Sequence, residues 1–380
     1  MYFIRSSPCL GHPILARFDT LARSTLSVVL NVDFSDGQWL QASLTVNSGG
    51  LGVRSVPLLA PSAFLASATG AQHLVNALLP PGVSGSVDGE AESALLCWRV
   101  LVLPDEPVPI NPSSQKAWDA ACVSCVFNSL IDNADMQSLS RLRAVSSRDA
   151  SSWLSALLLS SIGLRMSDEC CRIAVGLRLG ANLCLPHTCV CGARVDSRGV
   201  HGLSCARSAG RHVRHSMLND IICRALISAH VPASREPRGL CRSDGKRPDG
   251  VSLVPWSGGK CLVWDATVAD TLAPSHMGVT ATRAGAAAEK AALAKIGKYA
   301  SIVGTYKFIP VAFETLGSCS LMARKFVAEL GRRVSSATGN LREACYLRQR
   351  LSVAIQRGNA ASVLGTIRDF NTNFNFNEFS

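Results

Sequence analysis

The sequence is poor in charged residues and lacks any long uninterrupted hydrophobic run. Only 17 % of its 380 residues are charged whereas 47 % are hydrophobic, so most of the chain is expected to fold. No stretch of about 18 uncharged apolar residues occurs, so we predict no membrane-spanning helix and no membrane partner. Arg17 and Asp19 interrupt the apolar N-terminal stretch, and we therefore predict no signal peptide.

Lysine is absent from the first 110 residues, and this absence makes the charge distribution uneven. That segment contains five Arg and eight Asp or Glu, which gives it a net charge of −3. Because the whole chain carries +11, the remaining 270 residues carry +14. An excess of this size predicts a polyanion, DNA or RNA, as the partner of the C-terminal part. A basic surface without a partner is the alternative.

Cysteine is abundant, but its use does not suggest a disulfide framework. The chain has 15 Cys, an odd number, and most of them lie inside apolar stretches. Without a secretion signal, we expect a reducing intracellular compartment, such as the nucleus. Most of these side chains are predicted to be small core residues. This holds for Cys122 and Cys125, which form a CxxC pair on a helical stretch without a second pair of ligands.

The pattern of the chain changes near residue 183. Helical patterns cover 60–79 and 116–180, with loop-like segments at 80–93 and 105–115. After residue 206, a helix at 211–230 is followed by short strands at 231–237, 250–256 and 260–268, a helix at 283–301, a strand at 306–316, and helices near 319–337 and 341–356.

This order predicts an α/β core, a mixed sheet flanked by helices, preceded by a mostly α-helical linker region and a small Cys/His module. The predicted boundaries are 1–110, 111–183 (helical linker), 184–206 (Cys/His module), 207–337 (α/β core), 338–368 (C-terminal helices) and 369–380 (a disordered polar tail).

The Cys/His module has the spacing of a zinc site. The segment CVCGARVDSRGVHGLSC supplies Cys189, Cys191, His201 and Cys205 within 17 residues, with glycines for tight turns. Cysteine and histidine are the ligands that tetrahedral Zn²⁺ prefers. Cys184 and His187 lie close in sequence and could replace a ligand. The alternative is a loop that is rich in cysteine without binding metal.

Two aspartates accompany the predicted hairpin of the core. Asp249 follows a proline in KRPDG, and Asp265 lies inside the apolar strand KCLVWDATV. A hairpin with its turn at 255–260 would bring the two carboxylates together. Paired carboxylates suit Mg²⁺ or Mn²⁺, which prefer oxygen ligands and can assist phosphodiester hydrolysis. The pattern therefore predicts a metal-dependent nuclease site.

Further motifs follow in a characteristic order. Cys189, Cys191, His201 and Cys205 precede the Arg214–His215 pair, Glu236–Pro237, Arg247–Pro248–Asp249, Asp265, and Lys295, Lys298 and Tyr299. Over about residues 184–316, this order resembles the restriction-like endonuclease domain, of the PD-(D/E)xK superfamily, at the C-terminus of site-specific non-LTR retrotransposon proteins. In that family, a CCHC zinc knuckle precedes the nuclease.

The resemblance implies roles for individual residues. Asp249 and Asp265 would bind Mg²⁺ or Mn²⁺. Thr267 stands where the superfamily usually has lysine, so Lys298 or Lys295 from the next helix would replace that lysine. Glu236 would complete the site or cap a turn. The expected DNA contacts are Arg214, His215, Lys246 and Arg247, with a structural histidine as the alternative for His215.

The segment upstream resembles the thumb and linker region of the reverse transcriptase of these elements. No polymerase Tyr/Phe-x-Asp-Asp motif occurs. The resemblance implies a metal-dependent DNA endonuclease within a truncated retroelement protein. The alternatives are a catalytically decayed zinc-knuckle protein that binds nucleic acid and an adaptor without a nucleic-acid role.

Overall fold

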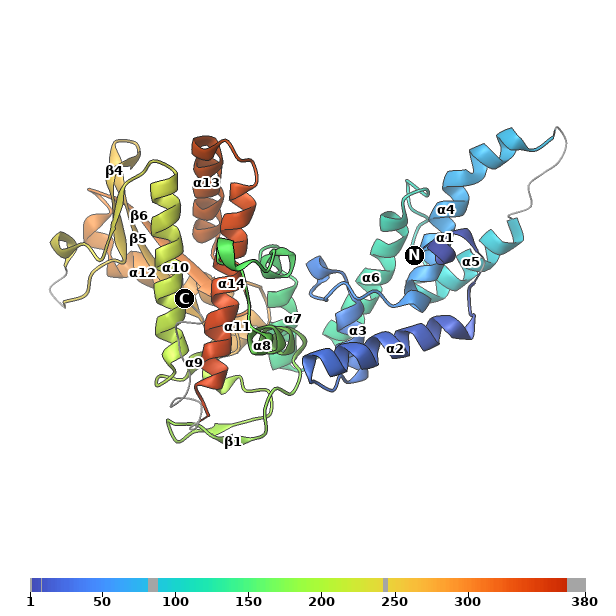
Figure 1. The fold of residues 1–380 in the computed structure, drawn as a ribbon, viewed down its shortest axis with the longest axis horizontal. Helices are drawn as coiled ribbons and strands as arrows, with labels where there is room; N and C mark the ends of the chain where they lie inside the picture. Colours follow the sequence, from blue (N-terminus) through green and yellow to red (C-terminus); the bar gives the residue numbers. More distant parts are fainter. Residues whose placement is uncertain (1, 8, 81–87, 242–244, 368–380) are drawn as a thin grey trace. The chain divides into compact units, whose positions relative to one another are not determined.

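The structure, a computed structural model, describes residues 2–7, 9–80, 88–241 and 245–367. The chain divides into two compact units, Met1–Ala134 and Asp135–Ser380, each with its own packed core (Figure 1). The predicted boundary at residues 110 and 111 lies inside the first unit, because helix α6 (Gln115–Asp132) packs against helix α4 (Val56–Leu78). The predicted tail at 369–380 lies outside the described residues.

The first unit is helical. Besides α4 and α6 it contains α1 (Tyr2–Ser6), α2 (Pro13–Leu30), α3 (Asp36–Ser43), a 3₁₀ turn (Val46–Ser48) and α5 (Asp88–Leu101). The rings of Trp98 and Trp118 meet edge to face with centroids 4.9 Å apart, and the indole N–H of Trp98 donates to the carbonyl of Trp118. Cys122 is buried in the same core, as expected of a small apolar side chain.

The second unit is a mixed α/β fold, as predicted. Its sheet has the order β3 (Ala233–Arg235), β4 (Gly250–Ser257), β5 (Lys260–Ala269) and β6 (Lys307–Glu314). The first three strands are antiparallel neighbours, whereas β6 pairs in parallel with β5. The β4–β5 hairpin turns at Gly258 and Gly259, both with positive φ, a conformation that glycine adopts without steric cost. The predicted hairpin is therefore confirmed.

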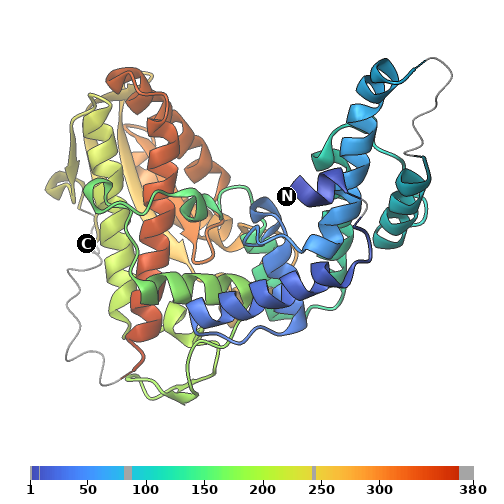
Figure 2. The ribbon, with the colours of Figure 1, turned by 45° about the vertical axis from the view of Figure 1, so that its right-hand side comes forward.

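Helices cover both faces of this sheet. On one face lie α10 (Ala209–Ser228), α13 (Leu321–Thr338) and α14 (Glu343–Leu364), with α10 and α14 side by side (Figure 2). On the other face lies α12 (Ala286–Lys298). The remaining elements are α7 (Met136–Val145), α8 (Asp168–Leu179), α9 (His201–Ser204), α11 (Pro274–Thr280), the strands β1 (His187–Thr188) and β2 (Arg194–Val195), and 3₁₀ turns at Ser152–Ser155, Ser160–Ile162, Arg238–Leu240 and Ala300–Ile302.

The alternation of side chains along β5 explains why an aspartate lies in an apolar strand. Leu262, Trp264 and Ala266 point to the core formed with α10, α13 and α14. Val263 points to the opposite face, where it packs with Tyr299. Successive side chains of a strand alternate between faces, so Asp265 lies on the α12 side with Val263.

Helix boundaries differ from expectation at three places. Helix α14 continues to Leu364 rather than ending near 356, because small residues such as Gly358 let it pack closely against α10. The helical pattern at 136–159 forms a helix only as far as Val145, and serine-rich turns follow. Part of the predicted loop at 80–93 is helical, since α5 begins at Asp88, while residues 81–87 lie outside the described part of the chain.

None of the helices in the described ranges combines the length and the apolar character that crossing a bilayer requires.

The close contact between Gly250 and Trp264 provides a test of the packing. A Cβ atom at Gly250 would lie 2.1 Å from the indole ring, and this ring is fully buried. We expect Gly250→Ala to lower the free energy of unfolding by about 1–3 kcal/mol through overpacking. Gly239→Ala, where a Cβ meets nothing within 4 Å, is the matched control. Denaturant unfolding followed by tryptophan fluorescence measures both; equal effects would contradict this packing.

Candidate functional site

The hairpin brings Asp249, which directly precedes β4, next to Asp265 in β5. The backbone N–H of Asp249 donates to the carbonyl of Trp264 at 3.1 Å, and the Oδ2 atom of Asp249 accepts from the N–H of Ala266 at 2.6 Å. The backbone of Asp249 is thus fixed to Trp264 and its carboxylate to Ala266, the two residues that flank Asp265. Both aspartates were predicted as site residues, and the structure brings them together.

Asp265 is buried, and a lysine compensates its charge. It is 2 % exposed, and Lys295 Nζ lies 2.5 Å from its Oδ1 atom. Among the described residues, that Oδ1 atom has no hydrogen-bond partner in addition to this ion contact. A buried carboxylate is costly unless its lone pairs are satisfied. The ion pair with Lys295 therefore offsets part of the cost of burying this carboxylate.

His215 holds Asp249 from the side of α10. Its Nε2 atom lies 3.0 Å from Oδ2 of Asp249. The hydrogen bond to Asp249 raises the pKa of His215, although burial of the ring acts in the opposite direction. Burial acts to raise the pKa of Asp249, but the hydrogen bond and charge of His215 together with the hydrogen bonds from Ala266 and Asn219 outweigh it, so that the pKa lies below its ordinary value. Asp249 is therefore held in the ionised form that a metal ligand requires.

Asn219 is part of this arrangement, and sequence reasoning missed it. Its Oδ1 atom accepts from the indole N–H of Trp264 at 3.0 Å, and its Nδ2 atom lies 3.4 Å from Nε2 of His215. Asn219 is one helical turn after His215, so both reach the same end of β5. The only signal in the sequence was that two polar residues, His215 and Asn219, lie four positions apart on a predicted helix.

The two predicted lysines have different surroundings. Lys295 contacts Asp265, whereas the ammonium of Lys298 lies 4.7 Å from the ring centroid of Tyr299. Tyr299 is buried, and its hydroxyl donates to the carbonyl of Arg247 at 2.9 Å. Of the two alternatives, the geometry favours Lys295 as the lysine at the carboxylates.

Glu236 and Arg247 form an ion pair beside the site rather than inside it. The backbone N–H of Glu236 donates to the carbonyl of Asp249 at 2.8 Å, while its carboxylate contacts the guanidinium of Arg247. Glu236 has a φ of +49°, which is uncommon for a residue other than glycine. Lys246 and Arg247 are exposed next to Asp249, where a phosphate backbone could reach them.

Arg214 is placed differently from the prediction of a DNA contact. It is 2 % exposed, and its guanidinium donates to Oδ1 of Asn359 and to the carbonyl of Leu203. A guanidinium buried with these partners joins α10 to α14 and is not available to a phosphate backbone. The adjacent His215 remains partly exposed at the carboxylates.

The predicted zinc ligands come together into one cluster. The ligand atoms of Cys189, Cys191, His201 and Cys205 all lie within 4.8 Å of one another. The Sγ atoms of Cys189 and Cys205 are 3.8 Å apart, and Sγ of Cys191 lies 3.3 Å from Nε2 of His201. Tetrahedral Zn²⁺ with Zn–S bonds of about 2.3 Å requires S–S separations of about 3.8 Å. These side chains could bind zinc.

Local backbone structure produces this cluster. Gly192, with a φ of +91°, donates to the carbonyl of Cys189, which permits a tight Cys-x-Cys turn after β1. His201 and Cys205 lie one turn apart at the two ends of α9. The N–H of Ala193 lowers the pKa of Cys191 to about 6, whereas burial raises the pKa of Cys189 to about 11.

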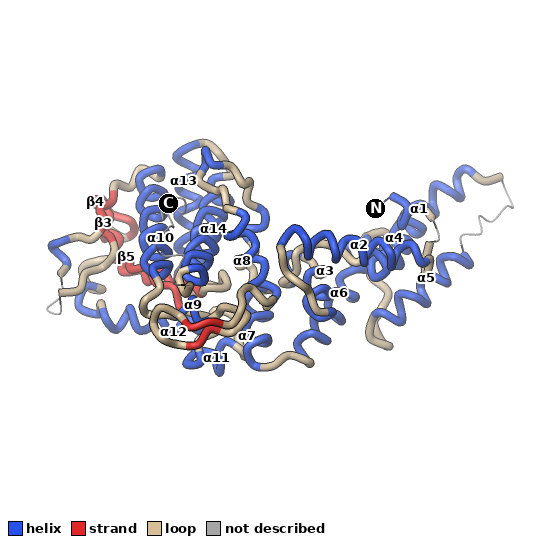
Figure 3. The backbone as a smooth tube through the Cα atoms, turned by 60° about the horizontal axis from the view of Figure 1, so that its bottom comes forward, coloured by secondary structure: helices blue, strands red, loops and turns tan. Residues whose placement is uncertain are grey.

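The other two possible ligands point elsewhere. Sγ of Cys184 contacts the carbonyl of Asp196, and the ring of His187 bonds to the carbonyl of Leu185 and to Oγ1 of Thr366. The module formed by β1, β2 and α9 lies at one end of the unit, separate from the main sheet (Figure 3). His187 and Gly202 attach it to the end of α14.

Comparisons of the chain with protein-family models and with curated protein sequences produced no match.

The metal content of variants tests the Cys/His cluster. We expect about one Zn²⁺ per chain, and Cys189→Ser should release it because one of four ligands is lost. Cys184→Ser is the matched control, since this thiol lies outside the cluster, and it should keep the metal. Elemental analysis of dialysed protein measures zinc. Equal zinc in parent and Cys189→Ser would contradict the assignment.

Proposed function

We propose that the second unit is a metal-dependent DNA endonuclease domain of the restriction-like PD-(D/E)xK type, from a non-LTR retrotransposon protein. The observation that carries the proposal is the convergence of Asp249 directly before β4, Asp265 in β5 and Lys295 in helix α12. According to the sequence resemblance, two carboxylates and a lysine are the groups with which the PD-(D/E)xK superfamily cleaves DNA.

The residues fit a hard divalent cation. Asp249 and Asp265 would hold Mg²⁺ or Mn²⁺, which would neutralise the charge of the scissile phosphate. The burial of Asp265 and its position beside Asp249 support this ligand role. His215 keeps Asp249 ionised and oriented.

Lys295 takes the place of the lysine that is missing at Thr267. Its ammonium lies at the carboxylate of Asp265, so it could orient an attacking water or stabilise the charge that develops on the phosphate. The exposed Lys246 and Arg247 would contact the DNA backbone and give affinity without sequence specificity.

The second candidate function is nucleic-acid binding without catalysis. Thr267 at the usual lysine position favours it, because decay of an active site would leave the basic surface and the Cys/His module in place. Binding of nucleic acid that weakens with salt, without cleavage under any metal, would support this function instead.

Plasmid cleavage tests the proposal. With Mg²⁺ or Mn²⁺, purified protein should nick supercoiled DNA, and Asp265→Asn should abolish nicking while DNA binding stays nearly intact. The substitution removes a metal ligand but preserves the shape of the side chain. Gel analysis of plasmid forms and a filter-binding titration measure the two properties. Cleavage by Asp265→Asn at the parent rate would refute the site.

The two lysines provide a matched pair of variants. Lys295→Ala should reduce the cleavage rate by about 10²-fold or more, because a cation that stabilises developing charge is removed. Lys298→Ala, three residues later on the same helix, should stay within a few-fold of the parent. Single-turnover nicking rates provide the comparison. If Lys298→Ala is the more severe, the assignment of the lysine must be reversed.

A further inference from the structure

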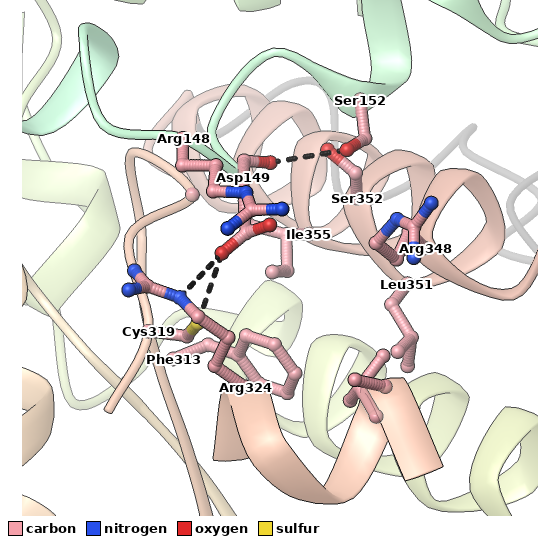
Figure 4. Close-up of a pocket in the computed structure, with 13 residues that line it drawn as sticks. Arg148, Asp149, Ser152, Phe313, Cys319, Arg324, Arg348, Leu351, Ser352 and Ile355 are labelled. Atoms are coloured by element: carbon pink, nitrogen blue, oxygen red, sulfur yellow. Dashed lines mark hydrogen bonds and ion pairs between the residues drawn. The ribbon is translucent and has the colours of Figure 1, made fainter. Parts of the chain in front are cut away.

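A cavity in the second unit lies apart from the carboxylate site. It has a volume of about 360 Å³ and is bounded by the turn after α7, the segment after β6, and helices α13 and α14 (Figure 4). This volume is within the range of small-molecule sites, about 300–1,000 Å³. Phe313 lines the cavity and faces the α13–α14 side of the sheet, whereas Asp265 faces α12. The sheet therefore separates the two sites.

The cavity is strongly basic. Arg148, Arg324 and Arg348 line it together with one acidic residue, Asp149. Nε of Arg324 donates to Oδ2 of Asp149 at 2.7 Å, so this pair is internally compensated. Within the described ranges, Arg148 and Arg348 form no ion pair with a carboxylate. Two guanidinium charges in the lining are thus left without an acidic partner.

The remaining lining is mainly apolar. Phe313, Leu351 and Ile355 lie near the arginines (Figure 4), and Val327 also lines the cavity. A simple inorganic anion would use the guanidinium groups but leave these apolar side chains in contact with water. A ligand that carries both an anion and an apolar or aromatic body would use both surfaces.

We propose that this cavity binds a phosphomonoester of nucleotide size, with the phosphate at Arg148 and Arg348 and the nucleoside against Phe313, Leu351 and Ile355. A phosphomonoester carries a charge of about −2 near neutral pH, which balances the two uncompensated guanidinium groups. Guanidinium groups also bind phosphate with paired hydrogen bonds. The ligand is either a free nucleotide or the phosphorylated end of a nucleic-acid strand. The proposal does not depend on hydrolysis at Asp249 and Asp265.

Isothermal titration of the full-length protein with AMP tests the site. No divalent cation is added, so that binding at the carboxylates does not contribute. AMP should bind, and adenosine and inorganic phosphate should each bind at least about tenfold more weakly, because each lacks one half of the ligand. Equal affinity for phosphate and AMP, or no AMP binding at millimolar concentration, would overturn the proposal.

Variants locate the binding on the protein. Arg348→Gln should weaken AMP binding at least about tenfold. Arg350→Gln is the matched control, since Arg350 lies on the same helix but pairs with Glu343 and does not line the cavity. Equal losses in the two variants would refute the site.

Asp149→Asn should raise the affinity for AMP, whereas Arg348→Gln should lower it. The Asp149→Asn change removes the only carboxylate among the described residues of the lining and should tighten AMP binding, an outcome that a folding defect would not produce. Weaker or unchanged binding would contradict the proposal.

A comparison of a 5′-phosphorylated dinucleotide with AMP distinguishes the two sources of the ligand. A 5′-phosphorylated dinucleotide that binds more tightly than AMP identifies a strand end, whereas tighter binding of AMP identifies a free nucleotide.

Discussion

The second unit is organised around a carboxylate buried in the middle of a strand. Asp265 is nearly inaccessible, and its compensation among the described residues comes from Lys295 on α12. Burial of an ionised group is unfavourable unless an opposite charge comes with it. The packing of α12 on the sheet therefore supplies the counter-charge as well as apolar contacts. A residue that costs stability in this way is typical of a site shaped by binding rather than by folding.

Two neighbouring residues of α10 connect this site to the Cys/His module. Arg214 points inward and joins Asn359 of α14 and Leu203 near the cluster, while His215 points to Asp249. The module in turn contacts the end of α14 through His187 and Thr366. Metal in the cluster would thus stabilise the helix pair that positions His215, so the module has a structural role whether or not it also touches nucleic acid.

Much of this unit could be predicted from the sequence because its signals are local. The Gly258–Gly259 turn and the apolar pattern around Asp265 determine the hairpin, and the spacing of cysteine and histidine predicts the cluster that could bind zinc. The burial of Arg214 could not be predicted, because an Arg-His pair looks the same in sequence whether the arginine is exposed or packed between two helices. The choice of Lys295 over Lys298, like the basic cavity, depends on tertiary packing.

Binding of Mn²⁺ to the zinc-loaded protein, followed by electron paramagnetic resonance, tests the central claim that Asp249 and Asp265 form a divalent-cation site. The account predicts one Mn²⁺ per chain in the parent, and loss of that binding in Asp249→Asn and in Asp265→Asn with the zinc content unchanged. Undiminished Mn²⁺ binding in both variants would contradict it, because the carboxylates would then be structural and the nuclease proposal would lose its basis.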